Sequence, residues 1–416
     1  MFSLSTMKFI DSWVGNTLCF LLSPIARMKR RSPVSYPSGA QKVLVVKFWG
    51  LGSIVLVSPA LERLKEKYPG CQIYFLTFED NRDVCGMIAN IDETLTIRIN
   101  AGIFRFMQDT VSVLFRLRRE RFDFVVDLEF FTRFSALITF LGGGKVKAGF
   151  HAWEAYRGSL HDIQVPFNYY WHVSNNFISL ATGNSAARER PVLPRLRVPA
   201  HALEWAGRFL AERGVGDQDL VLVVNPNAGE LALERRWPRE HFVALVRALC
   251  DRYQSRVFLI GGAGEESYTE GIVRDADRPK AESLAGKLPI HRLAALLSAA
   301  HLMITNDSGP LHLACGVGTP SIAFFGPETP VLYGPPGDNH RIFFKNISCS
   351  PCINVHNAKT ARCRHGHSDC LARISVAEVL DAVEQLLGRR GCRPASEPAV
   401  PGERGQSPIS ETACDK

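Results

Sequence analysis

The sequence predicts a two-domain α/β protein in which each domain is a doubly wound parallel sheet. Short apolar runs alternate with helical segments along most of the chain, as they do in strand–helix–strand units. A polar, Pro-punctuated segment at residues 188–199 interrupts this alternation and indicates a hinge. The length of 416 residues, with 46% hydrophobic and 22% charged residues, suits two globular domains.

Continuous apolar runs are typical of buried parallel strands, and they locate the elements. In the N-terminal half we expect strands at residues 42–48, 72–78, 122–128 and 147–150, and a helix that includes residues 60–68. In the C-terminal half we expect strands at residues 220–224 and 256–260 and helices at residues 239–253, 289–300 and 376–387.

These elements divide the chain into four parts. An apolar and basic segment with its linker occupies residues 1–40, and the two domains occupy residues 41–195 and 196–388. The tail, residues 389–416, is rich in Pro, Ser, Gly and charge, which predicts disorder.

The most informative stretch is residues 304–327, ITNDSGPLHLACGVGTPSIAFFGP. It predicts a buried strand, a polar turn, a short helix capped by Asp307 or Ser308, and a second apolar strand. Backbone N–H groups, the helix dipole and the hydroxyls of Thr305 and Ser308 would then surround one point, as in a phosphate site. An ordinary, well-capped strand–helix turn would show the same pattern.

TNDSGPLHLACGVGTP followed by FFGPETP resembles the signature of glycosyltransferase family 9, the bacterial heptosyltransferases that build the lipopolysaccharide core. Further similar segments follow in order: KVLVVKFWGLGSIVLVSPAL, NPNAG with RRWPREHF, LIGGAGEE and LAGKLPIHRLAALLSAAHLMITND. Together they extend over residues 42–387. The resemblance implies a GT-B fold, in which the two sheets face each other across a cleft, with the acceptor on the N-terminal domain and the nucleotide sugar on the C-terminal one.

The resemblance also implies an activity. We expect an inverting, metal-independent glycosyltransferase without a cofactor, which moves a heptose or related sugar from an ADP-sugar donor to a lipid-linked glycan acceptor in lipopolysaccharide core biosynthesis. Two alternatives stay open. One is a related transferase with another nucleotide sugar, and the other is a catalytically silent nucleotide-sugar-binding protein.

Several residues match the family's donor site. Arg235 stands where the family usually has a lysine that contacts the diphosphate, and arginine keeps that charge. Glu265 matches the carboxylate region that binds the ribose, and His312 resembles a histidine near the donor. By themselves, Arg235 and Arg236 would also suit an exposed basic pair, and His312 a structural role. The implied donor-binding residues are Asn227, Ala228, Arg235, Glu265, Thr305, Asp307, Ser308, Gly309 and His312.

A glycosyltransferase must neutralise the departing diphosphate, either with a metal or with cations and backbone donors. The D-x-D triplet Asp275-Ala276-Asp277 has the pattern of a metal-holding pair, but it is flanked by Arg274 and Arg278 and ends a helical segment. We therefore interpret it as a solvated surface pair.

The acceptor hydroxyl needs a proton acceptor, and here the sequence departs from the family. Heptosyltransferases typically carry an aspartate after the first-loop glycine, but this chain has Ser53 there. Glu129 follows a predicted strand and could supply the missing carboxylate; alternatively it pairs with Arg133. The resemblance assigns Lys47 and Gly52 of the same first loop to acceptor binding.

Four of the eleven cysteines, Cys349, Cys352, Cys363 and Cys370, are spaced in a way that could hold a structural zinc, with His356, His365 and His367 between them. Free thiols and a redox pair are the alternatives. The chain is too long and core-rich for a disulfide scaffold, so a reducing cytoplasm is expected.

The formal net charge of +8 favours anionic partners. No basic run is interleaved with aromatic residues, which argues against nucleic acid. The apolar residues 13–26 are too few to cross a bilayer, and their basic cluster, residues 29–31, follows them. This order predicts a helix that lies at the inner-membrane surface on its cytoplasmic side. A helix docked on the protein itself is the alternative.

Overall fold

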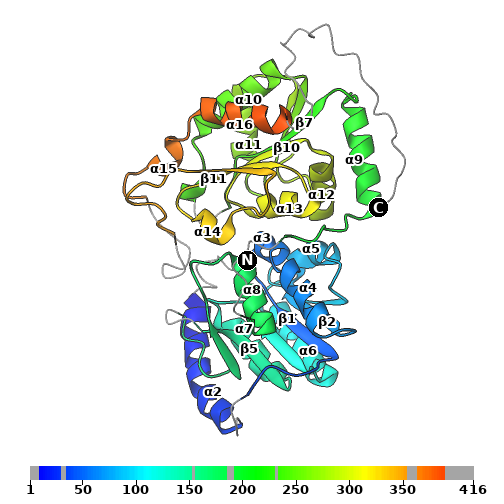
Figure 1. The fold of residues 1–416 in the computed structure, drawn as a ribbon, viewed down its shortest axis with the longest axis vertical. Helices are drawn as coiled ribbons and strands as arrows, with labels where there is room; N and C mark the ends of the chain where they lie inside the picture. The colour runs from blue at the N-terminus through cyan, green and yellow to red at the C-terminus, as the bar shows by residue number, and fades with distance from the viewer. Residues whose placement is uncertain are drawn as a thin grey trace, which may run out of the picture.

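The computed structural model describes residues 9–29, 34–151, 155–184, 192–229, 233–353 and 363–388. Within them the chain forms two α/β domains that are stacked one above the other (Figure 1). The tail for which the sequence predicts disorder, and part of the predicted hinge, lie outside the described residues.

The N-terminal domain is built on a six-stranded parallel sheet. In order across the sheet, its strands are β3 (Glu93–Ile97), β2 (Gln72–Phe78), β1 (Lys42–Val46), β4 (Phe124–Asp127), β5 (Val146–His151) and β6 (Ile163–Pro166). Alternate residues of β1 enter different cores, Val43 and Val45 on one face and Leu44 and Val46 on the other. A strand with both faces covered must be apolar throughout, which explains the run KVLVV.

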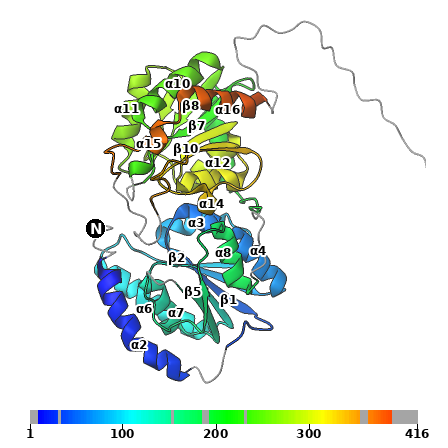
Figure 2. The same ribbon diagram turned by 60° about the vertical axis from the view of Figure 1, so that its left-hand side comes forward.

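Helices cover both faces of this sheet. One face carries α6 (Ile103–Glu120) and α7 (Arg133–Gly142), while the other carries α3 (Leu51–Val55), α4 (Ser58–Lys67), α5 (Arg82–Gly86) and α8 (Val173–Thr182). The N-terminal segment forms a π-helical turn, η1 (Asp11–Gly15), and then α2 (Asn16–Lys29), which dock on α7 (Figure 2). No helix in the described parts of the chain is long and apolar enough to cross a membrane.

The C-terminal domain repeats this strand order. Across its sheet lie β12 (His340–Phe344), β11 (Ser321–Phe325), β10 (Leu302–Asn306), β7 (Leu220–Asn225), β8 (Ser255–Leu259) and β9 (Ala281–Ser283), all parallel. One face carries α10 (Arg239–Arg252), α11 (Glu266–Ala276) and α16 (Val376–Gly388), and the other carries α9 (Ala200–Glu212), α12 (Ile290–Ala299) and α13 (Gly309–Val317). Shorter elements are η2 (Glu79–Asn81), η3 (Leu233–Arg235), α14 (Pro330–Tyr333) and α15 (Asp369–Ala372).

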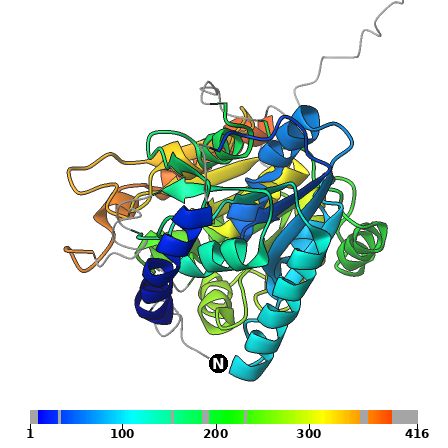
Figure 3. The ribbon, with the colours of Figure 1, turned by 90° about the horizontal axis from the view of Figure 1, so that it is seen from below.

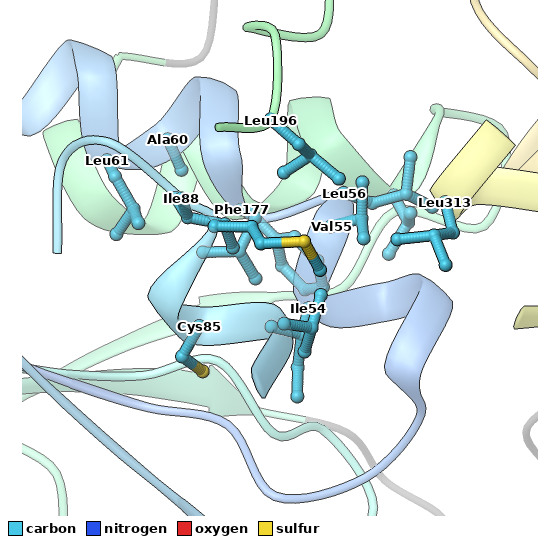
Figure 4. Close-up of a cluster of buried hydrophobic side chains, with 14 of the residues drawn as sticks. Ile54, Val55, Leu56, Ala60, Leu61, Cys85, Ile88, Phe177, Leu196 and Leu313 are labelled. Atoms are coloured by element: carbon cyan, nitrogen blue, oxygen red, sulfur yellow. The ribbon is translucent and has the colours of Figure 1, made fainter. Parts of the chain in front are cut away.

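One apolar cluster continues from the first domain into the second. In Figure 4, Leu313 of α13 lies beside Val55 of α3 and Leu196 of the linker. The linker is also hydrogen-bonded to both domains: Leu196 N donates to Gly316 O at 2.9 Å and Arg197 N donates to Met87 O at 2.7 Å. The two domains therefore share a packed joint between α3 and α13.

Candidate functional site

In open parallel sheets, ligands bind where the strand order reverses. That point lies between β1 and β4 in the first domain and between β7 and β10 in the second. The loops after these four strands contain most of the residues that the sequence singled out.

The loop after β1 contacts the loop after β10. A Cβ atom on Gly52 would lie 2.4 Å from His312 Cδ2 and 3.1 Å from the Cα of Gly309. No larger residue fits at position 52, so glycine is what permits the approach. Ser53, half-buried, follows directly in α3, and it therefore lies next to the start of α13.

A buried ion pair joins the loops after β1 and β4. Lys47 Nζ and Glu129 Oε1 are 2.9 Å apart, and both side chains are at most 1% exposed. The same Oε1 accepts hydrogen bonds from Phe48 N and Trp49 N, each at 2.8 Å, while Lys47 also donates to Trp49 O at 2.9 Å. Glu129 thus fixes the path of the first loop.

These contacts correct one expectation. The predicted pair between Glu129 and Arg133 is wrong, because Arg133 reaches the N-terminal segment instead, with Nε donating to Asn16 Oδ1 at 2.9 Å. Lys47, expected at the acceptor, is buried and bonded to Glu129 and Trp49, and its role in acceptor binding stays a prediction.

Below Glu129 lies a buried polar network that sequence reasoning missed. Arg157 donates to Glu129 O at 2.6 Å and to Asp127, and His161 Nε2 lies 3.1 Å from Asp127 Oδ2. Burial opposes ionisation of Asp127, but the guanidinium of Arg157 and the hydrogen bond from His161 outweigh it and lower the pKa of Asp127. Burial also lowers the pKa of His161, so that ring is neutral. The network holds the backbone that carries Glu129.

On the donor side, buried amides connect the loops after β7 and β10. Asn225 Nδ2 donates to Thr305 Oγ1 at 3.2 Å and to Ser308 Oγ at 2.9 Å. Asn306 Nδ2 donates to the carbonyls of Pro226 and Asn227 at 3.0 and 3.2 Å. Asn225 and Asn306 were not predicted as site residues.

This network changes the expected capping of α13. The helix begins at Gly309, with Pro310 in its first turn. Ser308 occupies the N-cap position, but its side chain makes no capping hydrogen bond, since it is engaged by Asn225 and lies 3.0 Å from Thr305 Oγ1. Thr305 is fully buried, so its hydroxyl supports the loop from behind.

Arg235 lies in this network. Its Nη1 is 3.3 Å from both Asp307 O and Asp307 Oδ2, and its Nη2 donates to Ala228 O at 2.7 Å. The side chain is only 21% exposed, so it is not the exposed surface arginine of the alternative interpretation. Arg235 therefore bonds two other predicted donor residues, Ala228 and Asp307.

Arg236 makes a second connection. It lies 3.5 Å from Glu265 Oε1 and 3.4 Å from Asn227 Oδ1, and its guanidinium lies over the ring of Tyr268. Glu265 Oε2 also accepts from Gly262 N at 2.8 Å. The expected ribose carboxylate and the predicted asparagine are thus next to each other.

Tyr333 of α14 connects the two halves of the site electrostatically. Burial raises the pKa of its hydroxyl well above the usual value, and the carboxylates of Glu328 and Asp307 raise it further. Glu129, from the other domain, acts on the same hydroxyl in the same direction. The carboxylates after β4 and β10 therefore face a common region at the domain interface.

The predicted surface pair Asp275 and Asp277 lies at the end of α11. Asp275 Oδ2 is 2.7 Å from Arg239 Nη2, and Asp277 is the left-handed residue that ends the helix. Asp275 is held by a cation, as expected of a solvated pair.

The four cysteines gather around a cavity of about 20 Å³, which Glu234, Pro327 and His365 also line. No group of three or more His, Cys, Asp or Glu side chains in the described ranges is arranged to hold a metal ion. His356 lies outside those ranges.

Burial raises the pKa of the Cys352 thiol, and the nearby Cys349 and Cys363 raise it further, so the thiols share one environment, although the described side chains form no metal-holding group. Cys363 Sγ donates to His367 O at 2.8 Å, and burial raises the pKa of Cys370 to about 11. The cluster instead braces donor loops, because Cys352 N donates to Pro327 O at 2.9 Å and Ser368 Oγ donates to Glu234 O.

Comparison with known proteins places this geometry in a family. The profile of glycosyltransferase family 9 (heptosyltransferase) matches residues 111–361, more than half of the chain. The lipooligosaccharide heptosyltransferase 2 of Haemophilus influenzae is 26% identical over 355 residues, which cover 83% of this chain and 99% of that protein.

Two solved structures share the fold. A family 9 glycosyltransferase from Veillonella parvula has a TM-score of 0.70 and 22% identity, covering 85% of this chain and 99% of the other. The Escherichia coli ADP-heptose LPS heptosyltransferase II has a TM-score of 0.68 and 20% identity, covering 84% and 99%. The architecture is the two-domain GT-B fold expected from the sequence. This chain therefore belongs to glycosyltransferase family 9, the heptosyltransferase family.

Proposed function

We propose that this protein is an inverting, metal-independent transferase that moves a heptose from an ADP-sugar to a lipid-linked acceptor during synthesis of the lipopolysaccharide core, at the cytoplasmic face of the inner membrane. Family membership supports glycosyl transfer. The names of its relatives, lipooligosaccharide heptosyltransferase and ADP-heptose LPS heptosyltransferase, support the sugar, the donor and the pathway.

The contact between Arg235 and Asp307 at the start of α13 carries the donor assignment. It combines the guanidinium of Arg235 with the positive end of a helix. A leaving diphosphate can be neutralised there without a metal. The pairing of Asp275 with Arg239 agrees with this, since that carboxylate is already engaged by a cation.

For proton removal we propose Glu129 Oε2. Oε1 is fixed by three donors, whereas Oε2 makes no hydrogen bond with any described residue. Lys47 would hold the carboxylate in place, and Arg157 would hold the backbone carbonyl of the same residue. Because Glu129 is fully buried, the acceptor would reach it only when the two domains separate.

Ser53 favours a second candidate function, a nucleotide-sugar-binding protein without transferase activity. Serine has no carboxylate to accept the proton, and the nearby Glu129 is already used to hold a loop.

One experiment separates these functions. The full chain is screened by calorimetry against ADP, UDP and GDP sugars, and the donor that binds is then assayed for transfer to lipopolysaccharide-core precursors. Transfer from an ADP-heptose that continues in EDTA is expected. Binding without transfer to any acceptor would favour the silent protein, and inhibition by EDTA that magnesium reverses would overturn the metal-free mechanism.

A further inference from the structure

The helices α2 and α6 each present an unusually apolar face to solvent. On α6 the exposed apolar residues are Phe104, Met107, Val111 and Phe115, a spacing of three, four and four residues that aligns them in one stripe. Phe104 is 90% exposed and Phe115 is 69% exposed. Sequence analysis did not single out this helix.

The N-terminal segment presents a second apolar face. Trp13, Phe20, Leu21 and Met28 are all more than half exposed. Only the opposite side of the helix docks, where Cys19 and Ala26 pack against Ala136 and Leu160. Burial of one narrow stripe therefore leaves most of the apolar side chains outside the core.

Both helices are fixed to the same support, α7. A Cβ on Gly15 would lie 2.6 Å from Arg133 Cβ, and a Cβ on Gly142 would lie 2.7 Å from Leu117 Cδ1 of α6. The carboxylate of Asp11 accepts hydrogen bonds from Arg133 N and Phe134 N at the start of α7. Figure 3 shows α2 and α6 on the same side of the N-terminal domain, with α7 between them.

The charge around these stripes is positive. The acidic residues of α6 are neutralised, since Asp109 is 2.7 Å from Arg98 and Glu120 is 2.7 Å from Lys42. By contrast, Arg105 and Arg119 on α6 are exposed and form no ion pair with any described residue. Apolar side chains beside unpaired arginines are the combination that binds an anionic bilayer. A dimer through the same face would bring these arginines together and be opposed by repulsion.

Each apolar stripe also begins at the end of the N-terminal domain that faces the other domain. In a parallel sheet, a helix that follows a strand begins at the strand's carboxyl end, which here faces the other domain. Phe104 and Met107 lie in the first turns of α6, after β3, and Trp13 belongs to η1, which contacts the first turn of α7, after β4. Phe104 and Trp13 therefore lie toward the end of the domain whose strand ends carry the loops of Glu129 and Ser53.

We propose that α2 and α6 form one lipid-binding surface, which lays the N-terminal domain on an anionic bilayer with the acceptor loops next to the headgroups. This deepens the proposed use of a lipid-linked acceptor, but the surface itself does not depend on transferase activity. It extends the membrane contact expected of the N-terminal helix to a second helix, α6, which lies after β3 in the chain.

Co-sedimentation of the full chain with vesicles tests the proposal. Wild type is expected to bind vesicles that contain phosphatidylglycerol, to release partly in high salt, and to bind phosphatidylcholine vesicles weakly. Phe104→Ser with Phe115→Ser, which leaves α2 unchanged, should weaken vesicle binding about 10-fold or more, because each buried phenylalanine contributes substantially to membrane affinity. Trp13→Ser with Phe20→Ser should have a similar effect.

The matched control is Leu203→Ser, which removes an exposed apolar residue from α9 in the other domain and should leave binding unchanged. ADP affinity by calorimetry should stay at the wild-type value in every variant, which shows that the fold and donor site are intact. Wild-type vesicle binding by the α6 variant would overturn the two-helix surface. Sedimentation velocity gives a second way to overturn it. If wild type self-associates and the same α6 substitutions abolish that association, the face is an interface between proteins. Absence of sugar transfer would contradict the proposed function and leave the vesicle result standing.

Discussion

Gly52 and His312 come from different domains, yet the His312 ring occupies the space that any side chain on residue 52 would need. A Cβ there would lie 2.4 Å from His312 Cδ2, closer than real Cβ contacts come. This contact is part of the joint between α3 and α13.

Gly52→Ala should force the two domains apart or displace the histidine ring. We expect a loss of about 1–3 kcal/mol in the free energy of unfolding, the usual cost of overpacking, together with slower sugar transfer. Urea unfolding and steady-state kinetics measure the two effects. Gly207→Ala in α9, where an added Cβ meets open space, is the control and should be neutral or stabilising. Equal stability of both variants would show that the contact is not tight.

Arg235→Ala should weaken ADP binding by about 1.5–3 kcal/mol, the range for a charge-assisted hydrogen bond, and should slow transfer at least as much. The measurement is isothermal titration calorimetry. Arg278→Ala is the control, because that arginine pairs with Asp251 on the surface of the same domain and should not affect ADP. Unchanged ADP affinity of Arg235→Ala would remove this residue from the donor site.

Glu129→Gln should lower kcat by about 10²–10⁴-fold if Oε2 removes the acceptor proton, with ADP affinity nearly intact. Lys47→Met separates this role from loop positioning, since it removes the buried cation and keeps the carboxylate. If Glu129 is the general base, Glu129→Gln should lose far more activity than Lys47→Met. Similar losses in both variants, with similar drops in thermal stability, would reduce Glu129 to a positioning residue.

Asp127→Asn should destabilise the N-terminal domain strongly, by about 3–5 kcal/mol, because it leaves the buried guanidinium of Arg157 without its counter-charge. The pKa of Asp127 is lowered by folding, so its contribution is present above the unfolded value, near pH 4, and is lost as the pH falls below that. The difference in unfolding free energy between wild type and variant should therefore shrink in acid.

Denaturant unfolding at several pH values measures this. The exposed Asp251→Asn serves as the control and should change stability much less. A gap between wild type and Asp127→Asn that stays constant down to pH 2 would contradict the assignment of a lowered pKa.

The sequence predicted the central strands well because they are buried on both faces. The predicted strand at residues 72–78 coincides with β2, and those at residues 42–48 and 122–128 contain β1 and β4. The edge strands β3 and β6 were not predicted. Both strands, ETLTI and IQVP, are only partly buried. A partly exposed strand does not need a continuous apolar run, so the pattern that revealed the central strands is missing.

The site was predicted where it is local and missed where it is not. Asp307, Ser308 and Gly309 follow one another in the chain, so their turn can be recognised from the sequence. Arg157 and His161 pair with Asp127 from 30 and 34 residues away, and only the fold brings them together. The solvent-facing apolar residues of α6 were also missed, because their spacing suits a helix with a buried apolar face equally well.

The linker bond between Leu196 and Gly316 has a consequence for motion. Because the linker is bonded to α13 and also to the end of α5, the pivot for any domain rotation passes beside the donor helix itself. If α13 holds the diphosphate as proposed, a rotation about such an axis barely displaces that diphosphate but sweeps the outer loops through a wide arc. The sugar acceptor, carried on the swinging half, would then be delivered to a nearly stationary donor.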